Sequence, residues 1–171
     1  MMTKFDYIIG IDPDVNLSGY AELNCNTEQV HLESMSFPML IEKVLQAQKK
    51  YKDYKLLIVV ELDRNTKYNW HLATKDNKFV AKAKGVAQGR NQQMAICIAE
   101  LLSRLGLEVI ERPPLKKCWA GKDKKITTDE LFRIAGLSFN KKRTNQEERD
   151  ACLLALYYSF IPLRLLNKKQ I

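Results

Sequence analysis

Residues 55–62 constrain the fold most, because they read Lys-Leu-Leu-Ile-Val-Val-Glu-Leu without alternation between polar and apolar side chains. A continuous apolar run of this length is typical of a strand that is buried on both faces of a helix-covered sheet. The run closes on an acid, Glu61. Residues 5–12 form a second short β-rich run, which ends on Asp12 before Pro13 breaks it.

The remaining chain alternates between strand and helix patterns. Residues 17–24 and 29–35 alternate polar and apolar side chains, which predicts an antiparallel meander, and residues 107–111 predict a further strand. Helical spacing of apolar residues predicts four helices, at about 38–51, 85–105, 127–135 and from 146 onward. We therefore expect an α/β fold with a mixed five-stranded sheet, an antiparallel meander plus parallel strands, flanked by helices. Most of residues 63–83 should form a functional loop.

Length and charge narrow the function. With 171 residues, of which 46% are hydrophobic, the chain suits one domain spanning residues 1–171. It carries 28 Lys and Arg against 20 Asp and Glu, a net charge of +8. Such a surplus favours polyanionic partners, because each neutralised phosphate releases condensed counterions. A soluble basic protein without such a partner would carry the same charge.

The cysteines and the N-terminus bear on the compartment. The four cysteines contain no C-x-x-C pair, and with only two histidines besides, a structural zinc site is not expected. An acid at position 6 argues against a signal peptide, and no apolar run approaches 18 residues. We expect a reduced, cytoplasmic protein without membrane contact, from a bacterium or made by a phage or virus in its host.

Four acids stand where metal-dependent phosphodiester chemistry would need them. Asp12 and Glu61 close two apolar strands, at the edge where open α/β sheets form ligand crevices. Glu147 and Asp150 are three residues apart and share one face at the start of the last helix. Acids in a first helical turn are also common partners of the helix dipole, so this last pair has a simpler explanation when it is taken alone.

Three segments together resemble the motifs of the RuvC-type Holliday junction resolvases. Ile9-Gly10-Ile11-Asp12-Pro13, followed by Ser18-Gly19-Tyr20, resembles the first-strand signature of that family. Val59-Val60-Glu61 resembles its second motif, and Glu147-x-x-Asp150-Ala151 with the aliphatic run behind it resembles the last. The order and the spacing match across nearly the whole chain.

The resemblance implies an RNase H-like fold and a Mg²⁺-dependent endonuclease that cleaves Holliday junctions or other branched DNA. Asp12, Glu61, Glu147 and Asp150 would be both catalytic residues and the ligands of two Mg²⁺ ions, for which Mn²⁺ would substitute. Lys117 (or Lys116) and Lys125 match the basic residues that the family places near the scissile phosphate. The family works as homodimers, because symmetric nicking of a four-way junction needs two sites related by a two-fold axis.

The chain departs from the family pattern in three places. Asp14 replaces the usual glycine after Asp-Pro and is either a peripheral ligand through water or a turn residue. Glu147 stands where aspartate is commoner. Residues 63–65 follow Glu61 where family members often carry a wedge aromatic; Tyr68 or Trp70 would either replace that wedge by stacking on unpaired bases or serve as buried anchors.

Basic and aromatic residues in three segments are the candidate DNA contacts. Residues 112–125 hold six basic side chains against a single acid, although any one lysine is explained as simply by a solvated surface position. The candidates are Arg64, Lys67, Tyr68, Trp70, Lys84, Arg90, Lys116, Lys117, Lys122, Lys124 and Lys125.

Three other functions would account for part of this pattern. Actin-like and sugar-kinase ATPases need glycine-rich phosphate loops, and the seven glycines of this chain contain no such cluster. A junction-binding protein that does not cut would need the basic surface but not the four acids. A nuclease of the same fold that acts on flaps, forks or RNA–DNA hybrids stays open, because such a site hydrolyses whichever backbone the basic surface delivers.

Overall fold

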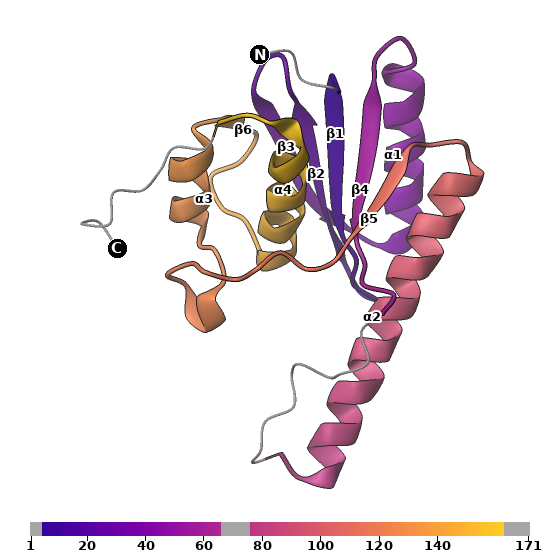
Figure 1. Ribbon diagram of the computed structural model, residues 1–171, viewed down its shortest axis with the longest axis vertical. Helices are drawn as coiled ribbons and strands as arrows, with labels where there is room; N and C mark the ends of the chain where they lie inside the picture. The colour runs from indigo at the N-terminus through magenta and orange to yellow at the C-terminus, as the bar shows by residue number, and fades with distance from the viewer. Residues whose placement is uncertain (1–4, 66–75, 163–171) are drawn as a thin grey trace.

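A computed structural model describes residues 5–65 and 76–162 and contains a sheet in the strand order β5-β4-β1-β2-β3-β6 (Figure 1). The strands are β1 (Tyr7–Asp12), β2 (Ser18–Asn24), β3 (Gln29–Met35), β4 (Leu56–Glu61), β5 (Val109–Arg112) and β6 (Ser138–Phe139). The helices are α1 (Phe37–Lys50), α2 (Lys78–Arg104), α3 (Thr128–Ala135) and α4 (Gln146–Ser159), with a 3₁₀ turn at Lys122–Lys124.

The sheet is mixed, as the sequence predicts. β1, β2 and β3 form an antiparallel meander, and β4 and β5 continue the sheet parallel to β1. This confirms the expected α/β class. The predicted number of five strands is wrong, because β6 pairs in parallel with β3 as a sixth. Its two residues are too few to show a hydrophobic period, so sequence reasoning had no signal for it.

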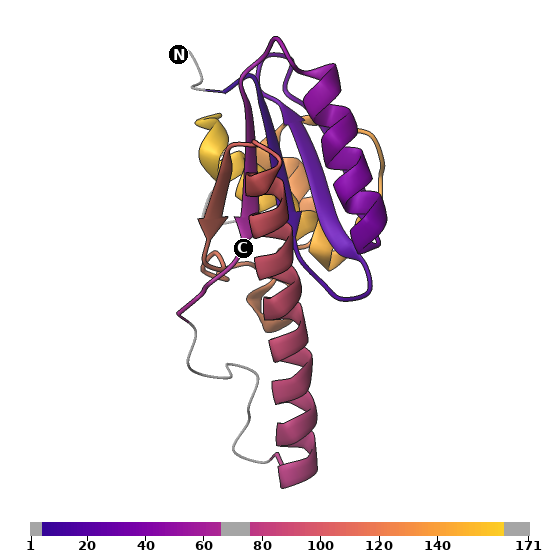
Figure 2. The same ribbon diagram turned by 90° about the vertical axis from the view of Figure 1, so that its right-hand side faces the viewer.

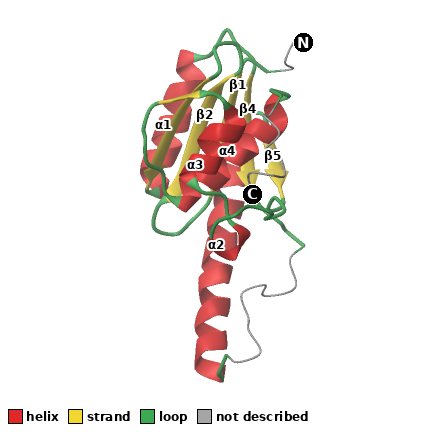
Figure 3. Ribbon diagram, turned by 90° about the vertical axis from the view of Figure 1, so that its left-hand side faces the viewer, coloured by secondary structure: helices red, strands yellow, loops and turns green. Residues whose placement is uncertain are grey.

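Helices cover both faces of the sheet, which explains the unbroken apolar run of β4. Leu57 and Val59 belong to the cluster with α3 and α4, whereas Ile58 and Val60 belong to the cluster with α1 and α2. Figure 3 shows α3 and α4 in front of the strands, with α1 on the far side. A strand between two apolar layers has no face on which polar side chains would meet water.

Helix α2 corrects the predicted boundary, since it begins at Lys78 rather than near Gly85. Asn77 caps it by accepting a hydrogen bond from the backbone N–H of Val80 (2.9 Å). The start was missed because the fully buried residues of α2 begin only at Ala95, so the first half carries no core-facing stripe. Figure 2 shows this half projecting beyond the sheet. None of the helices in the described part of the chain combines the length and apolar character needed to cross a membrane.

Two glycines let α4 lie directly on the sheet. A Cβ on Gly10 would stand 2.0 Å from the carbonyl oxygen of Ala151, and one on Gly19 would stand 2.0 Å from that of Glu147. Gly19 is also the register partner of Asp12 across β1 and β2. Backbone therefore packs on backbone at both positions, and the first turn of α4 is held beside the end of β1.

We predict that Gly10→Ala destabilises the protein by about 3 kcal/mol or more, because the new methyl group meets rigid backbone instead of a movable side chain. Urea unfolding measures the change. Gly89→Ala is the matched control, since a Cβ there has nothing within 4 Å, and it should stabilise α2 by about 0.5–1 kcal/mol. Equal stability of Gly10→Ala and the wild type would contradict the close approach.

Candidate active site

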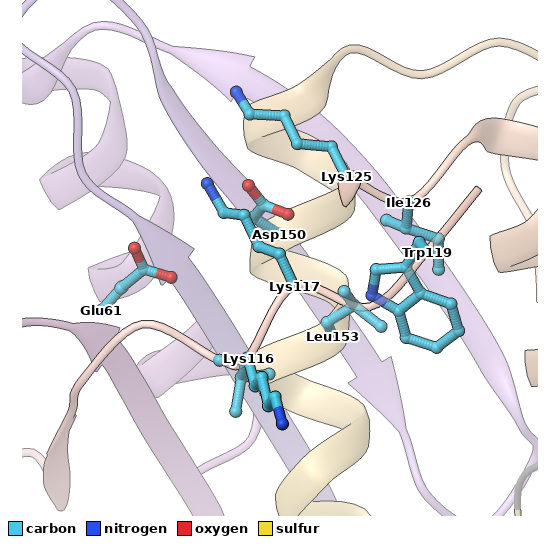
Figure 4. A pocket seen from close by; sticks show the side chains of 9 residues that line it. Glu61, Lys116, Lys117, Trp119, Lys125, Ile126, Asp150 and Leu153 are labelled. Atoms are coloured by element: carbon cyan, nitrogen blue, oxygen red, sulfur yellow. The ribbon is translucent and has the colours of Figure 1, made fainter. Parts of the chain in front are cut away.

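Three acids from separate elements lie at one edge of the sheet. Asp12 ends β1 and Glu61 ends β4, and these strands are parallel neighbours, so their carboxyl ends meet. Asp150 lies near the start of α4, which Gly19 admits to the same edge. All three acids are partly buried. In Figure 4 the carboxylates of Glu61 and Asp150 face the same space.

The pKa values show that these acids share one electrostatic environment. Burial raises the pKa of Asp12 well above its usual range, and the charges of Glu61, Asp150 and Glu147 raise it further. Burial, followed by the charge of Asp150, raises the pKa of Glu61 to about 7. Burial also raises the pKa of Asp150. Neighbouring negative charges thus make Asp12 and Glu61 harder to ionise, which favours any cation that enters.

Two lysines from the basic segment face the acids. Lys117 and Lys125 lower the pKa values of Glu61 and Asp150, in opposition to burial, so both ammonium groups lie near both carboxylates. The same four side chains line one pocket (Figure 4). Lys116 also lines it, but its ammonium group points to the other side in this view. Of the two lysines that the sequence left open, Lys117 is therefore the one placed over the acids.

The donor chemistry fits a hard divalent cation, although the arrangement is not a closed metal site. The acids offer only oxygen, which Mg²⁺ prefers. The part of the chain that the structure describes contains no group of three or more Asp, Glu, His or Cys side chains arranged to hold a metal ion. Charges influence one another over longer distances than a metal–oxygen bond of about 2.0–2.1 Å. The coupled acids therefore satisfy the electrostatic condition for metal binding, and the metal site stays a prediction.

Asp14 serves as a turn residue and a tether. Its Oδ1 accepts a hydrogen bond from the backbone N–H of Asn16 (2.8 Å), and its Oδ2 accepts one from Nδ2 of Asn91 in α2 (2.9 Å). Asn91 Oδ1 in turn accepts from the backbone N–H of Val15 (3.2 Å). Both carboxylate oxygens of Asp14 are engaged, which favours the turn alternative over a peripheral ligand. The contact also fixes α2 beside the loop that follows Asp12.

The other predicted DNA contacts fall into three groups. Arg64 and Lys84 are paired with acids: Arg64 donates to both oxygens of Glu111 (2.6 Å each), and Lys84 contacts Asp76 (2.7 Å). Arg90, Lys116, Lys122 and Lys124 are exposed. Lys67, Tyr68 and Trp70 lie outside the described residues.

Trp119 is a pocket residue that sequence reasoning missed. It is partly buried and lines the same pocket as Glu61 and Asp150, within the loop that carries the two lysines. Its backbone N–H donates to the carbonyl oxygen of Lys124 (3.1 Å), which closes the loop on itself. The sequence feature that could have indicated it is the presence of an aromatic residue inside the most basic segment.

Comparison with known proteins finds similar solved structures but no match by sequence. No family model matches the chain, and no curated protein matches it. A structure of Thermus thermophilus RuvC in complex with Holliday junction substrate is similar, with 16% identity, coverage of 94% of this chain and 99% of that one, and a TM-score of 0.47. A second structure of Thermus thermophilus RuvC shows 17% identity, coverage of 90% and 93%, and a TM-score of 0.49. Likeness at this level does not by itself assign an activity.

We predict that Glu61→Gln stabilises the metal-free protein at neutral pH. Folding raises the pKa of Glu61 from 4.5 to about 7, so the folded state holds the proton more tightly than the unfolded state. Wild-type stability therefore falls as pH rises between these values, and the glutamine variant escapes this loss. Its advantage should be small near pH 4.5 and reach up to about 3 kcal/mol near pH 8.

Urea unfolding with a chelator present, at both pH values, measures this difference. Glu42→Gln, at an exposed position of α1, is the control and should change stability little at either pH. A glutamine advantage that shrinks as pH rises would contradict the assignment of Glu61 to a buried acidic site.

Proposed function

We propose that this chain is a Mg²⁺-dependent endonuclease that cleaves four-way junctions or other branched DNA. One observation carries the proposal: Asp12, Glu61 and Asp150 are electrostatically coupled at one sheet edge, and Lys117 and Lys125 face them. The resemblance of the segments that contain these acids to RuvC-type motifs supports the same reading. So does the net charge of +8, which suits a polyanionic substrate.

Partly buried acids favour catalysis over binding alone. A protein that only holds DNA gains nothing from carboxylates beside the phosphate backbone, because like charges repel it. Their raised pKa values also mean that the charged forms cost folding free energy. Shifted pKa values in acids that converge on a pocket are typical of sites that perform chemistry.

Each group has a defined task in phosphodiester hydrolysis. Asp12, Glu61, Glu147 and Asp150 would hold two Mg²⁺ ions, with Mn²⁺ as a substitute. When bound, such ions would neutralise negative charge and lower the pKa of a water molecule, so that it can lose a proton and attack phosphorus as hydroxide near neutral pH. The ammonium groups of Lys117 and Lys125 contact the scissile phosphate and stabilise the negative charge that develops on its oxygens.

The substrate reaches this edge over the exposed cations of the basic segment. Lys116, Lys122 and Lys124 are exposed next to the pocket lysines in sequence, and the acid of the segment, Asp123, is also at the surface. Two copies of the chain would present two such edges. We therefore propose a homodimer that makes one incision per copy in a four-way junction.

Asp12→Asn should abolish Mg²⁺-dependent cleavage while junction binding largely survives, because the variant keeps the basic surface and removes a charged ligand. The assay uses purified protein with Mg²⁺ or Mn²⁺ and a panel of four-way junction, flap, replication fork, linear duplex and RNA–DNA hybrid. Glu61→Gln and Asp150→Asn should behave in the same way. Undiminished cleavage by Asp12→Asn would contradict the proposal. Preferential cleavage of another substrate would keep the nuclease and replace the four-way junction as its substrate.

Lys117→Ala should reduce the slope of log affinity against log salt concentration by about 1, since one phosphate contact is lost. Junction binding in Ca²⁺ over a range of salt concentrations measures the slope. Lys49→Ala, at an exposed position near the end of α1, is the matched control and should leave the slope unchanged. An unaltered slope for Lys117→Ala would show that this lysine makes no phosphate contact.

A further inference from the structure

Arg149 is the residue between Glu148 and Asp150 on α4, and its side chain joins separate parts of the chain. Its Nε donates to the carbonyl oxygen of Ile126 (2.8 Å), and its Nη1 donates to the carbonyl oxygen of Thr144 (2.6 Å). Nη1 also contacts the hydroxyl of Thr144 (3.1 Å). Nη2 donates to Oε1 of Gln146 (3.0 Å). With a longer contact from Nη1 to the hydroxyl of Thr128 (3.4 Å), the planar guanidinium therefore holds four neighbours in fixed directions.

Gln146 transmits this constraint to Asp150. Its Nε2 donates to Oδ1 of Asp150 (2.7 Å), while its Oε1 accepts from Arg149. A guanidinium only donates, so Arg149 decides which end of the Gln146 amide faces it and which end faces Asp150. One oxygen of Asp150 is thereby held in place, which limits the rotation of its carboxylate.

The bond to Ile126 holds the backbone next to Lys125. Ile126 is buried and directly follows Lys125, so the bond restrains the backbone one residue beyond the lysine. Glu130 of α3 holds the same loop from the other side, because its carboxylate accepts from the backbone N–H groups of Ala120 (2.9 Å) and Thr127 (3.0 Å). Arg149 ties this braced loop to α4, the helix that carries Asp150.

Helix α4 begins without the help of Arg149. A capping box between Asn145 and Glu148 satisfies its first turn. Gly10 and Gly19 set its distance from the sheet. Besides its bonds to Thr144 and Gln146 at the start of the helix, Arg149 therefore also joins the loop to α4.

We propose that Arg149, acting through Gln146 and Ile126, is a positioning residue that fixes Asp150 and Lys125 relative to one another. This inference rests on the proposed function and deepens it. Without Arg149 the Gln146 amide can turn, and the 119–126 loop loses its hydrogen bond to α4. Asp150 would then approach a cation less well, and Lys125 would approach the phosphate less well.

The test compares Arg149→Met, Gln146→Met and the double variant with the wild type. Mn²⁺ affinity is measured by calorimetry without DNA, and single-turnover cleavage is measured at saturating junction. Each single variant should weaken Mn²⁺ binding by about 10- to 100-fold, which is typical of groups that orient a metal ligand. The double variant should bind Mn²⁺ no more weakly than Arg149→Met alone, because both changes interrupt one chain of contacts.

The controls separate positioning from folding. Arg104→Met, at an exposed position in the last turn of α2, should match the wild type in every measurement. Junction affinity in Ca²⁺ should stay within about twofold for Gln146→Met, which keeps the bond from Arg149 to Ile126, so that its loss falls on the cleavage rate. If Arg149→Met fails to fold, Gln146→Met alone tests whether this chain of contacts positions Asp150. That variant leaves the bonds from Arg149 to the backbone in place.

Three results would overturn the assignment. Wild-type Mn²⁺ affinity and cleavage in both single variants would leave Arg149 a structural role alone. Fully additive losses in the double variant would show that the two side chains act independently. If the wild type neither binds Mn²⁺ nor cuts any substrate, the proposed function itself fails, and this inference fails with it.

Discussion

The contact of the α4 backbone with the backbones of β1 and β2 is the constraint on which the rest of the structure depends. Gly10 and Gly19 leave no side chain between helix and sheet, so Ala151 and Glu147 approach as closely as backbone atoms permit. That approach brings Asp150 to the edge where Asp12 and Glu61 end their strands. A larger residue at either glycine would separate the acids along with the layers.

The consequence of this contact is a site that opposes folding. Partly buried carboxylates are costly when charged, and here burial and neighbouring acids both raise their pKa values. Lys117 and Lys125 offset part of that cost. The two hydrophobic clusters on either side of the sheet supply the stability that offsets the cost of these charges. β4 alone contributes four fully buried side chains to them, Leu57, Ile58, Val59 and Val60.

The loop that carries the lysines is held by polar contacts rather than by secondary structure. Gly121 has no room for a side chain, because a Cβ would lie 2.3 Å from the carbonyl oxygen of Lys125. Glu130 accepts two backbone N–H groups at the ends of the loop, and Arg149 holds the carbonyl oxygen of Ile126. A basic segment that would otherwise be a solvated surface thus presents two defined ammonium groups.

The sequence by itself determined the α/β class, the meander, the two-sided burial of β4 and the positions of Asp12 and Glu61 at strand ends, because hydrophobic periods and strand ends are local properties. Only the tertiary structure decided that Lys117 rather than Lys116 faces the acids, that Asp14 is a tether to Asn91, and that Arg64 is paired with Glu111. It also showed α2 beginning at Lys78 and β6 joining the sheet. The difference is physical: apart from the start of α2, those contacts join residues from 33 (Lys117 and Asp150) to 109 (Gln29 and Ser138) positions apart in the chain, and no local pattern records which partners folding will bring together.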